Sequence, residues 1–118
     1  PQKHIDRLAL ADLALDQLPC SSHTTAADAL WAGVPVLTMY GNRFAGRVGA
    51  ALVKAVDEQE FIANRLDDYE LRLNALIANP AELQHAKARL ESKRVSSSLW
   101  NTAAFTRDLE ATLLSLFD

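Results

Sequence analysis

The chain has 118 residues, of which 49% are hydrophobic and 23% charged, and its formal net charge is −3. This composition is typical of one globular domain with a modest core, and the small net charge argues against nucleic acid or an anionic membrane as a partner held by bulk charge. Because no apolar run reaches the length of a membrane span and no basic-then-apolar leader opens the chain, we expect neither a membrane helix nor a signal peptide.

Residues 1–42 predict a βαβ-type unit. Ile5 and Leu8 share one face of a first helix, and residues 12–16 form a short apolar run that suits a buried strand. An Ala-rich helix over residues 25–32, stopped by Gly33, then leads to a second strand over residues 34–39. A unit of this kind holds its ligand beyond the carboxyl ends of its parallel strands.

Residues 43–118 predict helices to the end of the chain. The first, over residues 44–55, is expected to bury a face made of Val48, Ala51, Leu52 and Ala55. Acidic helix starts follow at residues 67–70 and 79–82. The last helix, over residues 102–117, carries an apolar stripe that is more typical of a core face than of a ligand site: Phe105, Leu109, Leu113 and Leu116.

The single cysteine, the scattered histidines and one basic run do not form a pattern typical of a reactive site. Cys20 is the single cysteine, which excludes an internal disulfide and favours a reducing, cytoplasmic location; we expect it to be a small core residue. The three histidines stand too far apart for a local metal motif, so no metal site is expected, and His85 is read as a surface residue. A basic run is read as a solvated helix face: Lys87, Arg89, Lys93 and Arg94.

The start of the helix near residue 25 carries the strongest functional signal. His23, Thr24 and Thr25 stand where the first backbone amides of a helix lack internal partners and attract an anion, so a diphosphate suits this position. Asp28 lies one turn further on the same face, where it can accept hydrogen bonds from sugar hydroxyls. The alternative is that a hydroxyl here simply caps the helix.

The run from His23 to Pro35, His-Thr-Thr-x-x-Asp-x-Leu-Trp-x-Gly-x-Pro, resembles the C-terminal catalytic half of the O-linked N-acetylglucosamine (O-GlcNAc) transferases of the SPINDLY-like kind. The similarity starts at His4 and extends through residues 96–102 and 105–110. It implies an α/β fold: the C-terminal portion of a GT-B, Rossmann-like, nucleotide-sugar-binding domain followed by several helices. It also implies transfer of N-acetylglucosamine, with inversion, from uridine diphosphate (UDP) to Ser or Thr hydroxyls of a protein.

The resemblance also implies roles for individual residues in the donor site. His23, Thr24 and Thr25 would cradle the pyrophosphate, and Asp28 would contact the ribose. His4 would pack against the uracil and the diphosphate. Arg7 stands where the family often has a basic residue near the donor, whereas Pro1 replaces a lysine that some members carry. No metal or other cofactor is expected.

The whole chain, residues 1–118, is therefore interpreted as a fragment of a donor-binding domain, with no catalytic residue of its own and no transferase activity when isolated. Two alternatives stay open: a related GT-B glycosyltransferase with another acceptor, and a non-catalytic interaction module. Leu13, Leu15, Val36 and Leu37 are expected to lie on an incompletely covered sheet, from which we expect a homodimer.

Overall fold

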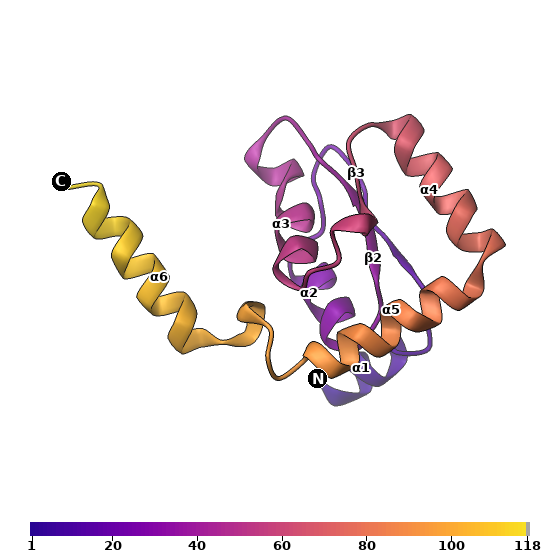
Figure 1. Cartoon of the computed structure of the whole chain (residues 1–118), viewed down its shortest axis with the longest axis horizontal. Coiled ribbons are helices and arrows are strands. Elements are labelled where there is room, and N and C mark those ends of the chain that lie inside the picture. Colours follow the sequence, from indigo (N-terminus) through magenta and orange to yellow (C-terminus); the bar gives the residue numbers. More distant parts are fainter. Residues whose placement is uncertain (118) are drawn as a thin grey trace.

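The computed structural model describes residues 1–117 and contains a three-stranded parallel sheet in the order β1-β2-β3 (Figure 1). The strands are β1 (Ala14–Leu15), β2 (Val36–Met39) and β3 (Ile62–Ala63). Ala14 pairs with Val36 in one ladder, and Thr38 pairs with Ile62 in the other. The expected βαβ unit is present, and its second strand lies at the centre of the sheet.

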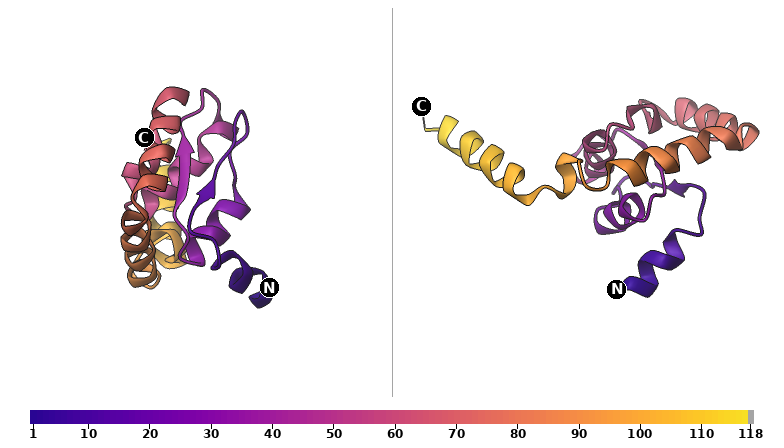
Figure 2. Two further views of the ribbon diagram at one scale, coloured as in Figure 1. Left: turned by 90° about the vertical axis from the view of Figure 1, so that its right-hand side faces the viewer. Right: turned by 60° about the horizontal axis from the view of Figure 1, so that its bottom comes forward.

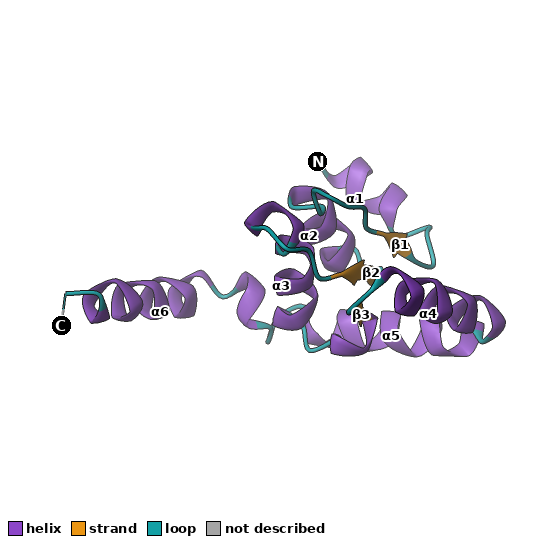
Figure 3. Ribbon diagram, turned by 90° about the horizontal axis from the view of Figure 1, so that it is seen from above, coloured by secondary structure: helices purple, strands orange, loops and turns teal. Residues whose placement is uncertain are grey.

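Helices cover both faces of the sheet (Figures 2 and 3). Helices α2 (Thr24–Trp31) and α3 (Val48–Ala55) lie on one face and α4 (Leu66–Ala78) on the other, while α5 (Pro80–Lys93) contacts both α4 and α2. Helix α1 (Gln2–Leu8) packs against α2 outside the sheet. Gly33 ends α2 with a φ of 80°, the left-handed conformation expected of a helix-stopping glycine.

The hydrophobic core lies between the sheet and its helices. Its largest members are fully buried: Phe61, Leu30, Leu37, Leu76 and Leu90. Val36 and Leu37 are 2% and 0% exposed, so two of the four residues expected on an uncovered sheet are core residues. For these two residues the expectation was wrong, because α4 packs on the second face of the sheet; Leu15 of β1 does keep an exposed side chain.

The region after residue 43 departs from the all-helical expectation. A 3-10 turn over Gln59–Phe61 leads into β3, a strand too short to leave a periodic signal. A second 3-10 turn, Phe44–Gly46, precedes α3. The buried face of α3 consists of Gly49, Ala50 and Val53, whereas Ala51 is exposed. Helix α3 therefore buries a different face from the expected one, because its Gly49 lies against Asp16 and Thr38 at the end of the sheet.

The basic run on α5 is not a solvated face. Arg89 donates to both carboxylate oxygens of the buried Glu58, and Lys93 lies 3.7 Å from the same group. Lys87 donates to backbone carbonyls before β1, and the Arg94 guanidinium lies over the Trp31 ring. These side chains therefore tie α5 to the body of the domain. His85 is exposed on α5, as expected.

Glu82, at the start of α5, accepts a hydrogen bond from Arg72 of α4, and this contact lowers the pKa of Glu82 below its usual 4.5. A depressed carboxyl pKa gives stability that is present above the unfolded value and lost as pH falls through the lower folded value. We expect Glu82→Gln to cost less than about 1 kcal/mol near neutrality, because the pair is partly solvated, and to flatten the loss of stability below pH 4.5. Thermal melts across the acid range measure this, with Glu91→Gln, at an exposed residue of the same helix, as the control. The same decrease of melting temperature with falling pH in both variants would contradict the prediction.

Helix α6 (Thr102–Ser115) extends away from the body of the domain (Figure 1). Its expected core stripe is exposed: Phe105 is 61% exposed and Leu113 48%. The expectation of a buried stripe was therefore wrong for this chain. An amphipathic helix needs a partner for its apolar face, and the described part of the chain supplies none for this one.

We expect the chain on its own to self-associate through the α6 stripe, because pairing two stripes removes apolar area from water at about 25 cal/mol per Å². Sedimentation equilibrium from micromolar to hundred-micromolar concentration is the measurement. Leu109→Glu should weaken association, whereas Leu71→Glu, at an exposed leucine of α4, should not. A constant mass near 12.9 kDa would contradict the prediction.

Candidate functional site

The candidate site lies where β1 and β2 end and α2 begins. In parallel α/β sheets, ligands bind beyond the carboxyl ends of the strands, and the N-terminus of the intervening helix points to the same side. Asp16 follows β1 directly, and the segment from Ser21 to His23 leads into α2. The sequence therefore folds so that the His23 turn lies at this edge.

The first turn of α2 is open to a ligand. His23 is the N-cap residue, and no side chain accepts a hydrogen bond as its cap. Thr24 and Thr25 begin the helix with exposed side chains, and neither hydroxyl forms a hydrogen bond within residues 1–117. Helix α2 therefore lacks the hydroxyl cap that the alternative interpretation predicted. The hydroxyls and the first backbone amides are all available to an anion.

Asp16 shapes the turn that precedes His23. Its Oδ1 accepts hydrogen bonds from the backbone amides of Ser22, at 2.6 Å, and Gln17, at 2.8 Å. Its Oδ2 accepts from the Thr38 hydroxyl of β2 at 2.7 Å, and Thr38 is fully buried. Charge-assisted bonds of this kind are the strong ones. One carboxylate thus joins β1, β2 and the turn before α2.

Helix α3 approaches this carboxylate closely because Gly49 has no side chain. A Cβ atom on Gly49 would overlap the Asp16 carboxylate and lie 3.0 Å from Thr38 Oγ1. The Gly49 amide donates to the Ser21 hydroxyl at 3.0 Å, and that hydroxyl donates to the Ala45 carbonyl at 2.9 Å. The segment before His23 is therefore fixed from both sides.

Helix α1 brings two of the expected residues to Asp28. His4 Nε2 lies 3.2 Å from Asp28 Oδ2, and Arg7 Nη2 lies 3.2 Å from His4 Nδ1. The side chains of His4 and Asp28 are 42% and 35% exposed, so solvent and ligand reach them. The structure thus brings His4, Arg7 and Asp28 together, one turn along α2 from Thr24 and Thr25.

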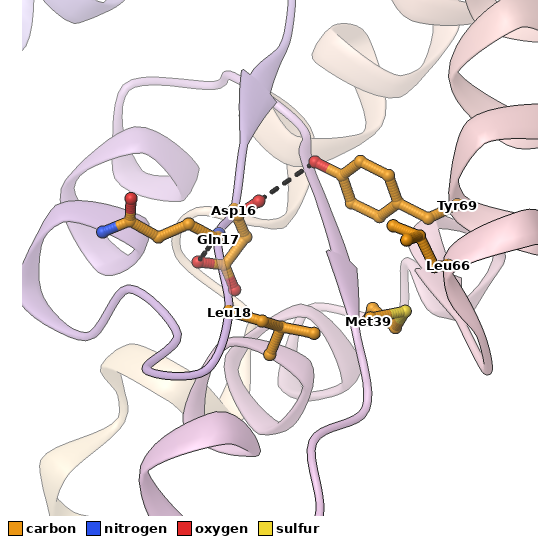
Figure 4. Close-up of a pocket in the computed structure, with 6 residues that line it drawn as sticks. All are labelled: Asp16, Gln17, Leu18, Met39, Leu66 and Tyr69. Atoms are coloured by element: carbon orange, nitrogen blue, oxygen red, sulfur yellow. Dashed lines mark hydrogen bonds between the residues drawn. The ribbon is translucent and has the colours of Figure 1, made fainter.

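A cavity of about 340 Å³ lies beside the site, between the ends of β1 and β2 and the start of α4 (Figure 4). Its walls are mostly apolar, and the six side chains in Figure 4 line it: Asp16, Gln17, Leu18, Met39, Leu66 and Tyr69. The Tyr69 hydroxyl donates to the Asp16 carbonyl at 3.0 Å. Burial, reinforced by the nearby Asp16 charge, raises the pKa of Tyr69.

Sequence reasoning missed Asp16 and misplaced Cys20. An acidic residue directly after a buried strand is the signal that could have identified Asp16. Cys20 is exposed rather than a core residue, because the segment between β1 and α2 runs along the surface. Within residues 1–117, no three His, Cys, Asp or Glu side chains are grouped in a way that could hold a metal ion, and no helix there is long and apolar enough to span a membrane.

Comparisons with known proteins agree on one family. Residues 1–109 match the model of glycosyl transferase family 41. The chain is 34% identical over 117 residues to the probable UDP-N-acetylglucosamine–peptide N-acetylglucosaminyltransferase SEC of Arabidopsis thaliana, covering 98% of this chain and 12% of that protein. It is 31% identical to the UDP-N-acetylglucosamine–peptide N-acetylglucosaminyltransferase of Caenorhabditis elegans, covering 92% of this chain and 10% of that one.

A solved structure confirms the fold. A mutant of the Thermobaculum terrenum O-GlcNAc transferase superposes with a TM-score of 0.82 and 33% identity, covering 92% of this chain and 21% of the other. The expected α/β fold, a portion of a GT-B domain followed by helices, is confirmed. The chain spans about an eighth of the length of the curated relatives. From the family match, the relatives and the superposition together, we conclude that this chain belongs to glycosyl transferase family 41.

Proposed function

We propose that the chain forms the UDP-binding side of the donor site in a UDP-N-acetylglucosamine-dependent protein O-glycosyltransferase. The observation that carries this proposal is the uncapped start of α2 beside the Arg7–His4–Asp28 cluster. Backbone amides and hydroxyls suit a diphosphate, and a carboxylate suits the ribose beside it. The names of the curated relatives support the sugar and the peptide acceptor.

In this proposal, the His23–Thr25 turn binds the diphosphate, and the positive end of α2 stabilises the negative charge that grows on the departing UDP. The helix N-terminus and the hydroxyl groups would then stabilise the diphosphate charge, a role that a metal ion has in other enzymes. We therefore propose that transfer needs no metal. An acceptor Ser or Thr hydroxyl attacks the anomeric carbon with inversion. No residue of this chain is assigned as the base. A cytoplasmic location suits the one, exposed cysteine.

The donor-site proposal predicts that this chain binds UDP weakly, in the millimolar range or at about −4 kcal/mol, and transfers no sugar. His23→Ala and Thr25→Ala should each weaken binding by about 1 to 3 kcal/mol, because a charged phosphate loses hydrogen bonds. Amide chemical-shift changes of the ¹⁵N-labelled chain during titration with UDP measure this.

Matched controls use the same substitutions away from the site. His85→Ala on α5 and Thr112→Ala on α6 should leave UDP binding unchanged. Shift changes should centre on the first turn of α2. Equal binding by the site variants and the controls would overturn the proposed phosphate cradle.

A further inference from the structure

The segment over residues 29–56, from α2 to just after α3, carries positive charge only. It includes three cationic side chains and no aspartate or glutamate, although the whole chain has a formal net charge of −3. The three cations are Arg43, Arg47 and Lys54, and all are exposed. The ion pairs within residues 1–117 all involve other side chains. The positive charge of this segment is therefore unmatched in the part of the chain that the structure describes.

Two of these cations line one small cavity. It measures about 230 Å³, and Tyr40, Ala50 and Ala51 form the rest of its lining. Arg47 directly precedes α3 and Lys54 lies in the last turn of that helix, so the two side chains, seven residues apart, project from the same helix face. The cavity shares no lining residue with the candidate site at the start of α2. It is therefore a separate place where an anion would meet two positive charges and an aromatic ring.

The Arg47 guanidinium is already held in place by the protein. Its Cζ lies 5.1 Å from the centre of the Tyr40 ring, and its Nη1 donates to the Gly41 carbonyl at 3.1 Å. The other guanidinium nitrogens, Nε and Nη2, donate to no residue within 1–117. A guanidinium binds a carboxylate or a phosphate with two parallel N–H donors. Because the side chain is fixed beforehand, it loses less conformational entropy when an anion uses the remaining donors.

An exposed aromatic ring beside the cations indicates a protein as the partner. Phe44 is 84% exposed. It begins the 3-10 turn that leads to Arg47, and in such a turn side chains three residues apart lie on the same side. Aromatic side chains and arginine are enriched where proteins contact one another. A small inorganic anion would leave the Phe44 ring in water, whereas a peptide supplies both a negative charge and apolar atoms.

We propose that Tyr40, Phe44, Arg47 and Lys54 form a docking surface for an acidic segment of a partner protein. An anionic side chain of the partner enters the cavity between Arg47 and Lys54, and an apolar side chain next to it covers Phe44. A carboxylate and a phosphate ester share the required chemistry, because both present oxygen acceptors to the remaining donors of Arg47. Each exposed ion pair contributes little, so binding needs several contacts together and weakens with added salt. The inference does not depend on the proposed donor site.

Amide chemical-shift titrations of the ¹⁵N-labelled chain with three synthetic peptides test this proposal. The first peptide has glutamates on both sides of one leucine, the second has glutamines in their place, and the third has one phosphoserine in place of a glutamate. We expect the first and the third to shift amides within residues 40–54 and the second to shift none. Tighter binding of the third peptide would identify a phosphate ester as the preferred anion, whereas equal binding would identify carboxylates as sufficient.

Variants then identify the side chains that bind. Lys54→Gln should weaken binding of the glutamate peptide about threefold, the scale of an exposed ion pair. Phe44→Ala should also weaken it, because the leucine of the peptide loses an apolar contact. Both residues are exposed, so these substitutions leave the core intact, and thermal melts check this. Arg107→Gln removes the same charge from an exposed position of α6 and should leave binding unchanged.

Several results would overturn the proposal. Equal binding of the glutamate and glutamine peptides would mean that the surface attracts apolar groups regardless of charge. Equal weakening by Lys54→Gln and Arg107→Gln would mean that only the net charge of the chain matters. Shift changes centred on the first turn of α2 would place the acidic peptide at the proposed diphosphate site instead. The absence of any shift with the glutamate and phosphoserine peptides would exclude the docking surface altogether.

Discussion

Gly49→Ala is expected to destabilise the chain by about 3 kcal/mol, the upper end for overpacking a closed interior. At an open position in a helix, the same change would stabilise by about 1 kcal/mol. The sign of the change in the free energy of unfolding therefore already distinguishes a closed position from an open one. The new Cβ atom would occupy the position of the Asp16 carboxylate, which Thr38 and the Ser22 amide hold in place. Moving the carboxylate gives up those hydrogen bonds and loosens the turn before His23.

Urea unfolding of single and double variants measures the effect and isolates its cause. In an Asp16→Ala background the overlap with the carboxylate is absent and only the 3.0 Å approach to Thr38 Oγ1 remains, so Gly49→Ala should cost less than about 1 kcal/mol there. UDP-induced shifts at the start of α2 should also weaken in Gly49→Ala alone. Additive costs of the two substitutions would contradict the proposed contact between Gly49 and Asp16.

The part of the site that could be predicted from sequence is local. His23 directly precedes the helix, and the spacing of three and four residues places Thr24, Thr25 and Asp28 on a common face of it. Gly33 marks the end of that helix for an equally local reason. Because each inference concerns neighbours along the chain, no knowledge of the tertiary packing was needed.

The contacts between distant segments could not be predicted in this way. Asp16 meets Thr38 across the sheet and Gly49 from the opposite helix, and no periodic pattern links the three. The same holds for α1, whose His4 reaches Asp28 only because α1 packs against α2. The resemblance grouped His4 with Asp28 in a donor site, but their hydrogen bond emerged only from the fold.

Amphipathic patterns were informative about secondary structure and misleading about burial. The stripe that includes Phe105 and Leu113 does form a helical face, yet it is exposed, because a periodic pattern does not say which surface will cover it. On α5 the error was the reverse. Charged residues suggested a solvated face, but the side chains of Arg89 and Lys93 reach inward to a carboxylate that follows α3.

Arg89 of α5 neutralises the buried carboxylate of Glu58. We expect Arg89→Met to lower the free energy of unfolding by about 3 kcal/mol, the scale for leaving a buried charge without its partner. Glu58 is 1% exposed and receives two hydrogen bonds from Arg89, at 2.9 and 2.8 Å. The hydrogen bond to Glu58 is also the main reason that the pKa of Arg89 is raised. Without Arg89, the Lys93 ammonium, 3.7 Å away, is the one cation within residues 1–117 that still pairs with the carboxylate.

Replacing Glu58 by glutamine should recover part of this loss, because a neutral amide is less costly to bury than an unpaired carboxylate. We therefore expect the Glu58→Gln, Arg89→Met double variant to be more stable than Arg89→Met alone, with urea unfolding at neutral pH as the measurement. Arg107→Met, at an exposed arginine of α6, should stay within about 0.5 kcal/mol of wild type. If Arg89→Met matched that control, the ion pair would be a surface contact of little consequence, and α5 would be held to the domain by its apolar face alone.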